Sequence, residues 1–212
     1  MARRRAIISA RGESYLDEMV ALSQRLDEAF AELLGLPNLA ARSRNGPDAM
    51  ACLRYQRGDD ERSAAPNQQR MGAHSDYTSF TILNTDAVAG LQILSGGAWL
   101  GVEPVEGAPL LNVGDLFAMW TNDVWPSTLH RVPLRGDGSD AALRRSVAYF
   151  HYTDLDVAVA PLDDRTVGPP RYEPVTVRDH LAAKLVGPKI GRKSQGAITL
   201  GDRTLEQIDN PD

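Results

Sequence analysis

The sequence predicts a mainly β domain, built as a sandwich or jelly roll with flanking helices. Between residues 72 and 150, short apolar or alternating runs are separated by Gly, Asn and Asp, a pattern typical of antiparallel strands joined by tight turns. An amphipathic helical pattern precedes this region and a shorter one follows it. At 212 residues the chain is long enough for one domain with its own apolar core.

The first expected element is a helix over residues 14–34, where apolar residues recur at steps of three and four. Ser14 and Asp17 have the spacing of a capping box, and Gly35 with Pro37 predicts the helix end. A loop over residues 36–50 then leads to a strand at 51–56. The charged, turn-prone stretch at 58–71 is expected to be a surface loop.

Six further strands are expected, at residues 77–83, 91–94, 99–102, 110–113, 116–120 and 146–150. Gly114-Asp115 is interpreted as a hairpin turn between two of them. A proline-rich connection at 161–174 precedes a short helix at 177–186, and residues 187–212 form a polar tail.

The composition excludes several classes of site and partner. Cys52 is the only cysteine, so the chain has no internal disulfide and no cysteine-based zinc or iron-sulfur site, as fits a reducing cytoplasm. A formal net charge of −5 argues against nucleic-acid binding, and no apolar run is long enough to span a membrane. We therefore expect a cytoplasmic monomer or homodimer that binds a small molecule.

His74 and Asp76 form a candidate pair of metal ligands, because side chains two apart in a strand point to the same side. A His-x-Asp match arises by chance roughly 0.4 times in a chain of this composition, so the pair alone means little. His130 supplies a third ligand. Two histidines and one carboxylate form the facial triad of non-haem Fe(II) oxygenases, which leaves coordination positions open. A zinc hydrolase is the alternative, but no HExxH arrangement is present, and iron is preferred.

Arg144 and Ser146 form a candidate carboxylate-binding pair on one face of the last strand. About one Arg-x-Ser match is expected by chance, and Arg192-Lys193-Ser194 is a second one. Arg144 is favoured because it opens an apolar strand. The same alternation places His151 on the opposite face, so His151 is not expected to bind the metal, and His180 is expected to be a surface or packing histidine.

These residues resemble the isopenicillin N synthase-like family of Fe(II)/2-oxoglutarate-dependent dioxygenases. The resemblance covers about residues 14–186 and is most specific over 72–150. The blocks that carry it, in the family's order, are Leu53-Arg54-Tyr55, His74-Ser75-Asp76-Tyr77-Thr78, Thr81-Ile82-Leu83, Gly90-Leu91-Gln92, residues 99–102, Asn112-Val113-Gly114-Asp115, Trp120-Thr121-Asn122, Ser127-Thr128-Leu129-His130-Arg131-Val132 and Arg144-Arg145-Ser146.

The resemblance implies a double-stranded β-helix, a distorted jelly roll of the cupin type, that holds Fe(II) between His74, Asp76 and His130. It implies 2-oxoglutarate as co-substrate, with its distal carboxylate at Arg144 and Ser146, and O2 as oxidant. Tyr55 is expected as a further hydroxyl donor to 2-oxoglutarate. The implied reaction hydroxylates, desaturates or cyclises a small molecule and releases succinate and CO2, with no catalytic residue beyond the metal centre. Phe150, Trp120 and Asn122 are expected near the substrate.

The resemblance also divides the chain. Residues 51–186 correspond to the dioxygenase jelly roll, residues 1–50 to a remnant of the family's longer N-terminal region, and residues 187–212 to the polar tail. Three explanations of this short N-terminal region stay open: a family member that is naturally short, a partner protein that fills the missing part, or a truncated form. Two functional alternatives stay open: a family oxidase that uses no 2-oxoglutarate, and an inactive jelly roll that only binds a ligand.

Overall fold

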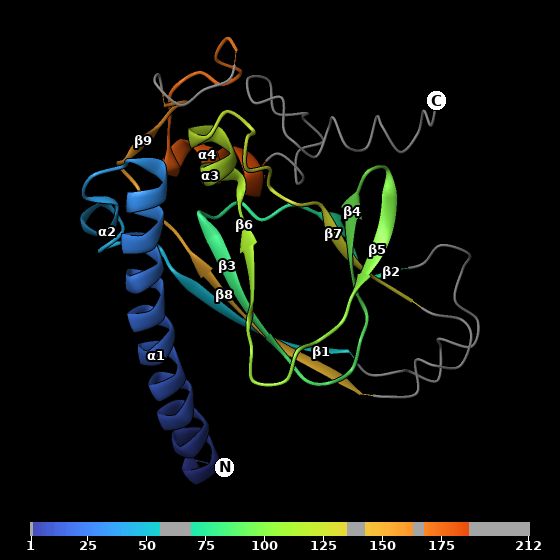
Figure 1. Ribbon diagram of the computed structural model, residues 1–212. Helices are drawn as coiled ribbons and strands as arrows, with labels where there is room; N and C mark the ends of the chain where they lie inside the picture. Colours follow the sequence, from blue (N-terminus) through green and yellow to red (C-terminus); the bar gives the residue numbers. More distant parts are fainter. Residues whose placement is uncertain (1, 56–68, 135–142, 163–167, 187–212) are drawn as a thin grey trace.

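Figure 1 shows the computed structural model, which describes residues 2–55, 69–134, 143–162 and 168–186, with side chains from residue 11 onward. The helices are α1 (Ala2–Leu34), α2 (Leu39–Arg42), α3 (Asp115–Trp120) and α4 (Val177–Val186). The strands are β1 (Ala49–Tyr55), β2 (Gln69–His74), β3 (Phe80–Thr85), β4 (Leu91–Ser95), β5 (Ala98–Val102), β6 (Leu110–Val113), β7 (His130–Pro133), β8 (Arg144–His151), β9 (Ala158–Val159) and β10 (Val175–Thr176).

Two four-stranded antiparallel sheets form the body of the domain. The major sheet has the order β1-β8-β3-β6 and the minor sheet the order β2-β7-β4-β5. Strands distant in sequence are therefore neighbours, and the chain passes back and forth between the sheets (Figure 1). This is the expected double-stranded β-helix, a jelly roll whose two sheets enclose an interior between them.

The apolar core lies on the outer side of the major sheet, under the helices. Period-two alternation turns Phe80 and Ile82 of β3 away from the interior, and both are fully buried. Phe30 of α1 packs on Phe80 with ring centroids 5.4 Å apart, and on Phe117 of α3 at 4.8 Å. The apolar face of α1 thus packs into this core, as its sequence spacing predicts.

Helix α1 is longer than expected at its start. It begins at Ala2, so Ser14 lies inside the helix and the capping-box interpretation of Ser14 and Asp17 is wrong. The predicted end is confirmed. Gly35 adopts a left-handed φ of 60°, and Leu36 N donates to the Ala31 carbonyl at 3.0 Å.

The expected strand at 116–120 is wrong, because these residues form helix α3. All of its side chains are buried, so the run carries no polar face that could reveal its period. Gly114-Asp115 accordingly begins a helix and is not a hairpin turn. A Cβ at Gly114 would lie 2.2 Å from the Thr78 carbonyl oxygen, and this close approach explains the glycine.

The remaining predictions agree with the structure to within a few residues, with some omissions. Strand β6 and helix α4 have the predicted bounds, and β1, β4, β5 and β8 differ from the predicted runs by a few residues. β3 begins three residues later than predicted. The surface loop was predicted to extend to residue 71, but β2 already starts at residue 69. The elements α2, β7, β9 and β10 were not predicted. Residues 187–212 lie outside the described residues. Within the described chain, no helix is both long enough and apolar enough to cross a membrane.

Candidate metal centre

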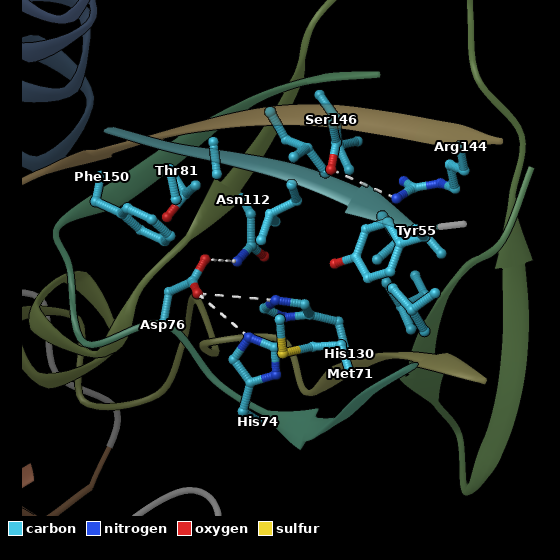
Figure 2. A pocket seen from close by; sticks show the side chains of 18 residues that line it. Tyr55, Met71, His74, Asp76, Thr81, Asn112, His130, Arg144, Ser146 and Phe150 are labelled. Carbon is cyan, nitrogen blue, oxygen red and sulfur yellow. Dashed lines mark hydrogen bonds and ion pairs between the residues drawn. The ribbon is translucent and has the colours of Figure 1, made fainter. Parts of the chain in front are cut away.

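His74, Asp76 and His130 meet at one end of the interior between the sheets (Figure 2). His74 and His130 are register partners at the ends of β2 and β7, and their ring centroids are 4.2 Å apart. Asp76 lies two residues after the end of β2, and its Oδ1 lies 3.9 Å from His74 Nε2 and 3.7 Å from His130 Nε2. One potential ligand atom from each residue lies within 4.8 Å of the others, as a single metal ion requires.

Both imidazoles are oriented by backbone carbonyls. His74 Nδ1 lies 2.8 Å from the Gly72 carbonyl oxygen, and His130 Nδ1 lies 3.0 Å from that of Thr128. Because a carbonyl only accepts, each Nδ1 carries the proton and each Nε2 keeps its lone pair. Carbonyl groups in this position fix the tautomer that a metal ligand needs.

Asp76 is held in a similar way. Asn112 of β6 donates from Nδ2 to Asp76 Oδ2 at 2.8 Å, which leaves Oδ1 on the side of the two histidines. Helix α3 fixes the backbone, because Asp115 N donates to the Asp76 carbonyl at 2.8 Å. Lys184 of α4 anchors α3 in turn, with its Nζ 3.0 Å from Asp115 Oδ2.

The protonation state also suits a divalent cation. Burial lowers the pKa of His74 below its ordinary value, and the neighbouring His130 lowers it further. The His74 ring is therefore neutral at physiological pH and available as a ligand. Two imidazoles and one carboxylate, with no fourth His, Cys, Asp or Glu joining the cluster among the described residues, fit the facial triad of Fe(II).

A cavity of about 220 Å³ extends from these three residues between the sheets. Its walls are mainly apolar and come from β1 to β4 and β6 to β8. Figure 2 shows the three candidate ligands on one side of this space and Arg144 with Tyr55 away from them. The residues that line it are Ala51, Leu53, Tyr55, Met71, His74, Asp76, Thr81, Leu83, Leu91, Ile93, Leu110, Asn112, His130, Val132, Arg144, Ser146, Ala148 and Phe150.

Arg144 brings a buried positive charge to the cavity. Its side chain is only 3% exposed, its Nη1 lies 3.5 Å from Ser146 Oγ, and its guanidinium lies 5.3 Å from the centre of the Tyr55 ring. The Arg144 Nε–H has no hydrogen-bond partner in the described chain, and no carboxylate there forms an ion pair with this guanidinium. A buried guanidinium in this state fits an anionic ligand, and a carboxylate matches its fork.

Tyr55 can donate a hydrogen bond beside this guanidinium. Burial raises the pKa of the Tyr55 hydroxyl above its ordinary value, more than the Arg144 charge lowers it. The phenol is therefore protonated at neutral pH. The cavity thus offers a metal-binding end and a carboxylate-binding end, which together suit a 2-oxo dicarboxylate.

Of the three residues expected near the substrate, one lines the cavity and two do not. Phe150 lines the cavity, beyond Asp76 and Thr81 (Figure 2). Trp120 does not line it: its ring is 2% exposed in the core and lies 5.5 Å from that of Phe117. Asn122 does not line it either, because its side chain accepts from Arg171 N at 2.8 Å and donates to the Pro169 carbonyl at 3.2 Å. Their side chains face the core and the 168–171 segment instead, and a contact of either residue with a substrate stays a prediction.

Two other histidines lie away from the centre, as the strand alternation predicts for His151. His151 is buried beneath α1 between Asp27 and Asp48, and His180 is buried on α4 near Asp115. Asn112 was not identified as a site residue from the sequence. In the structure Asn112 is the register partner of Thr81, which also lines the cavity.

Comparisons with known proteins agree with this geometry. The model of the 2OG-Fe(II) oxygenase superfamily matches residues 47–153. The chain is 31% identical over 183 residues to homoarginine-6-hydroxylase 2-ODD-233 of Oryza sativa subsp. japonica, covering 82% of this chain and 54% of that relative. It is 36% identical over 118 residues to gibberellin 3-beta-dioxygenase 1 of Pisum sativum, covering 54% of this chain and 30% of that relative.

Solved structures give the same result. The crystal structure of a full-length Neurospora crassa protein in complex with alpha-KG superimposes with a TM-score of 0.76 and 27% identity, over 85% of this chain and 57% of that one. The complex of the same fungal protein with alpha-KG and thymine has a TM-score of 0.72 and 27% identity, over 82% and 55% of the two chains. This chain spans about half the length, or less, of the curated relatives that it matches.

Proposed function

Because the chain belongs to the 2OG-Fe(II) oxygenase superfamily, we propose that it is an Fe(II)- and 2-oxoglutarate-dependent dioxygenase that oxidises a small-molecule substrate. The observation that carries the proposal is the placement of two different binding groups at the two ends of the cavity. Three convergent metal-ligand atoms lie at one end, and a buried guanidinium without a carboxylate partner in the described chain lies at the other. Relatives named for homoarginine and gibberellin, and a neighbour with bound thymine, support a small-molecule substrate.

In this proposal His74, Asp76 and His130 hold Fe(II), which supplies the one-electron chemistry that activates O2. The balanced reaction consumes O2, 2-oxoglutarate and a substrate C–H bond, and yields succinate, CO2 and a hydroxylated product. The chain's own contribution is positional. Asn112 keeps one oxygen of Asp76 directed at the histidines, while Arg144, Ser146 and Tyr55 bind the distal carboxylate of 2-oxoglutarate.

The apolar walls contribute by excluding water from the space between the two ends. Leu53, Leu91 and Val132 lie among the residues that line this space. In such surroundings a charge-assisted hydrogen bond is worth roughly 1.5 to 3 kcal/mol. Arg144 therefore selects an anionic co-substrate, and Phe150 lies where it can contact the molecule that is oxidised.

The test is the release of succinate from 2-oxoglutarate in the presence of Fe(II) and O2. We expect succinate formation by the wild-type protein, and its loss at low 2-oxoglutarate in Arg144→Ala. Arg145→Ala is the matched control, because Arg145 is the adjacent arginine on the exposed face of β8. Oxygen uptake without succinate would instead favour a family oxidase in which Arg144 binds a carboxylate of the substrate. Absence of both reactions would favour an inactive binding domain.

A further inference from the structure

The loop that joins β3 to β4 is fastened to the backbone at the start of β8. Asp86 N donates to the Arg145 carbonyl at 3.1 Å, and Arg145 N donates to Asp86 Oδ2 at 2.7 Å. The other carboxylate oxygen of Asp86 accepts from Val88 N at 3.2 Å, which folds the loop on itself. One aspartate therefore fixes both the loop and the residue that follows Arg144.

The far end of this loop lies against the Arg144 side chain. A Cβ at Gly90 would be 3.3 Å from Arg144 Cδ and 3.7 Å from Arg144 Nε. The first of these distances is tighter than an ordinary van der Waals contact, so a Cβ at position 90 would push the Arg144 side chain aside by a few tenths of an ångström. Because Gly90 has no side chain, the Arg144 side chain can occupy this space.

Arg144 has somewhere to move if it is displaced. A second cavity of about 130 Å³ lies beside the first, and Arg144 lines both of them. Val88 and Gly90 belong to the walls of this second cavity. The guanidinium can therefore give way to a Cβ at position 90 by moving into this space, while the φ of 157° at Gly90 adds backbone strain to any substitution there.

Asp86 also acts on the charge of Arg144. Burial lowers the pKa of the Arg144 guanidinium, whereas Tyr55 and, to a smaller extent, the negative charge of Asp86 raise it. Asp86 does this without an ion pair to Arg144 in the described chain, because its two oxygens accept from backbone N–H groups. Asp86 therefore does not occupy the donors of the guanidinium, which remain available for a ligand.

We propose that residues 86–90 are a positioning loop for Arg144, in which Asp86 fixes the loop and Gly90 leaves the space that sets the direction of the guanidinium. This inference rests on the proposed function, in which Arg144 binds the distal carboxylate of 2-oxoglutarate. Asp86 and Gly90 contact no co-substrate in this scheme. They act through Arg144.

The test compares Gly90→Ala with Gly97→Ala, a control between β4 and β5 where the φ is also positive, at 78°, but an added Cβ has nothing within 4 Å. The first readout needs no ligand: the NMR signal of the Arg144 Nε–H, assigned by its absence in Arg144→Lys. The second is the dissociation constant of 2-oxoglutarate for the Fe(II)-loaded protein without O2. In Gly90→Ala we expect the signal to shift and the dissociation constant to rise about tenfold, with Fe(II) affinity unchanged. In Gly97→Ala neither readout should change.

Kinetics separate positioning from a general loss of structure. Gly90→Ala should raise the KM for 2-oxoglutarate while kcat at saturation stays close to that of the wild type. If Gly90→Ala does not fold, Asp86→Asn decides by the same readouts, because asparagine keeps the size but loses the charge and one acceptor. An unchanged Nε–H signal together with unchanged affinity would overturn the inference. If the wild type binds no 2-oxoglutarate, the proposed function fails, and the Nε–H shift still decides whether the loop positions Arg144.

Discussion

The metal centre and the cluster around His151 use the same two kinds of side chain, histidine and aspartate, in opposite proportions. In the cavity, two imidazoles face one carboxylate, Asp76, at 3.7 to 3.9 Å, too far for hydrogen bonds. Beneath α1, one imidazole lies between two carboxylates: His151 Nε2 is 3.0 Å from Asp27 Oδ2, and its Nδ1 is 3.0 Å from Asp48 Oδ2.

The difference determines what each cluster can do. Both ring nitrogens of His151 are engaged by acceptors, so this imidazole is protonated and has no lone pair for a metal. Burial alone would lower the pKa of His151, but its hydrogen bonds to Asp27 and Asp48 outweigh burial and raise the pKa to about 9. The cavity histidines each keep a free Nε2. The proportion of carboxylate to imidazole therefore separates a structural ion cluster from a metal centre.

The largest expected effect comes from removing the single carboxylate of the cavity. Asp76→Ala should abolish Fe(II) binding at concentrations that saturate the wild type, because two imidazoles cannot hold a divalent ion alone. Anaerobic calorimetric titration with Fe(II) measures this. His151→Gln serves as the control and should bind one equivalent of Fe(II). Unchanged binding in Asp76→Ala would mean that the metal lies elsewhere.

The buried cluster should make stability depend on alkaline pH. The folded-state pKa of His151, about 9, is above the ordinary value of 6.5. The stabilisation is therefore complete below about pH 6.5 and lost as the pH rises through about 9, up to about 3 kcal/mol in all. Urea unfolding of the wild type and of His151→Gln at both ends of this range measures it. If the wild type and His151→Gln lose the same free energy of unfolding over this pH range, His151 is not the group responsible.

A smaller effect is expected when the support of Asp76 is removed. Asn112→Ala deletes the donor to Asp76 Oδ2 but leaves all three candidate ligands. Fe(II) affinity should fall by about tenfold, because groups that orient a ligand typically contribute that much. Fe(II) titration measures the change, with thermal unfolding of the metal-free protein as the check on folding. An unchanged affinity would show that the backbone after β2 and α3 alone fix Asp76.

The smallest effect is expected for an ion pair outside both clusters. Arg178 Nη2 lies 2.8 Å from Asp156 Oδ1, but the two side chains are 57% and 87% exposed. Arg178→Ala should change the free energy of unfolding by less than about 0.5 kcal/mol. Urea unfolding measures this. A loss comparable with that of His151→Gln would show that burial does not decide how much a charged pair stabilises this domain.

The sequence was most informative where side-chain alternation applies. Arg144, Ser146 and Phe150 line the cavity as the parity of β8 requires, and His151 faces the other way. Residues 116–120 were misassigned because a fully buried run has no polar face. Trp120 and Asn122 were expected near the substrate from their family block, but their direction depends on how α3 and the segment after it pack.

Tertiary contacts explain the features that the sequence did not reveal. His151 differs from His74 through Asp27 and Asp48, which are 124 and 103 residues away from it. No local pattern links such distant residues. The same holds for Asn112, whose role depends on its contact with Asp76, 36 residues earlier.

The most direct test of the central claim is a titration of 2-oxoglutarate into the Fe(II)-loaded protein without O2, following the absorption band that a 2-oxo acid produces on binding Fe(II). We predict a band that saturates at one equivalent in the wild type, is absent in Asp76→Ala, and requires far more 2-oxoglutarate in Arg144→Ala. Absence of the band in the wild type, or the same affinity in Arg144→Ala, would contradict the account.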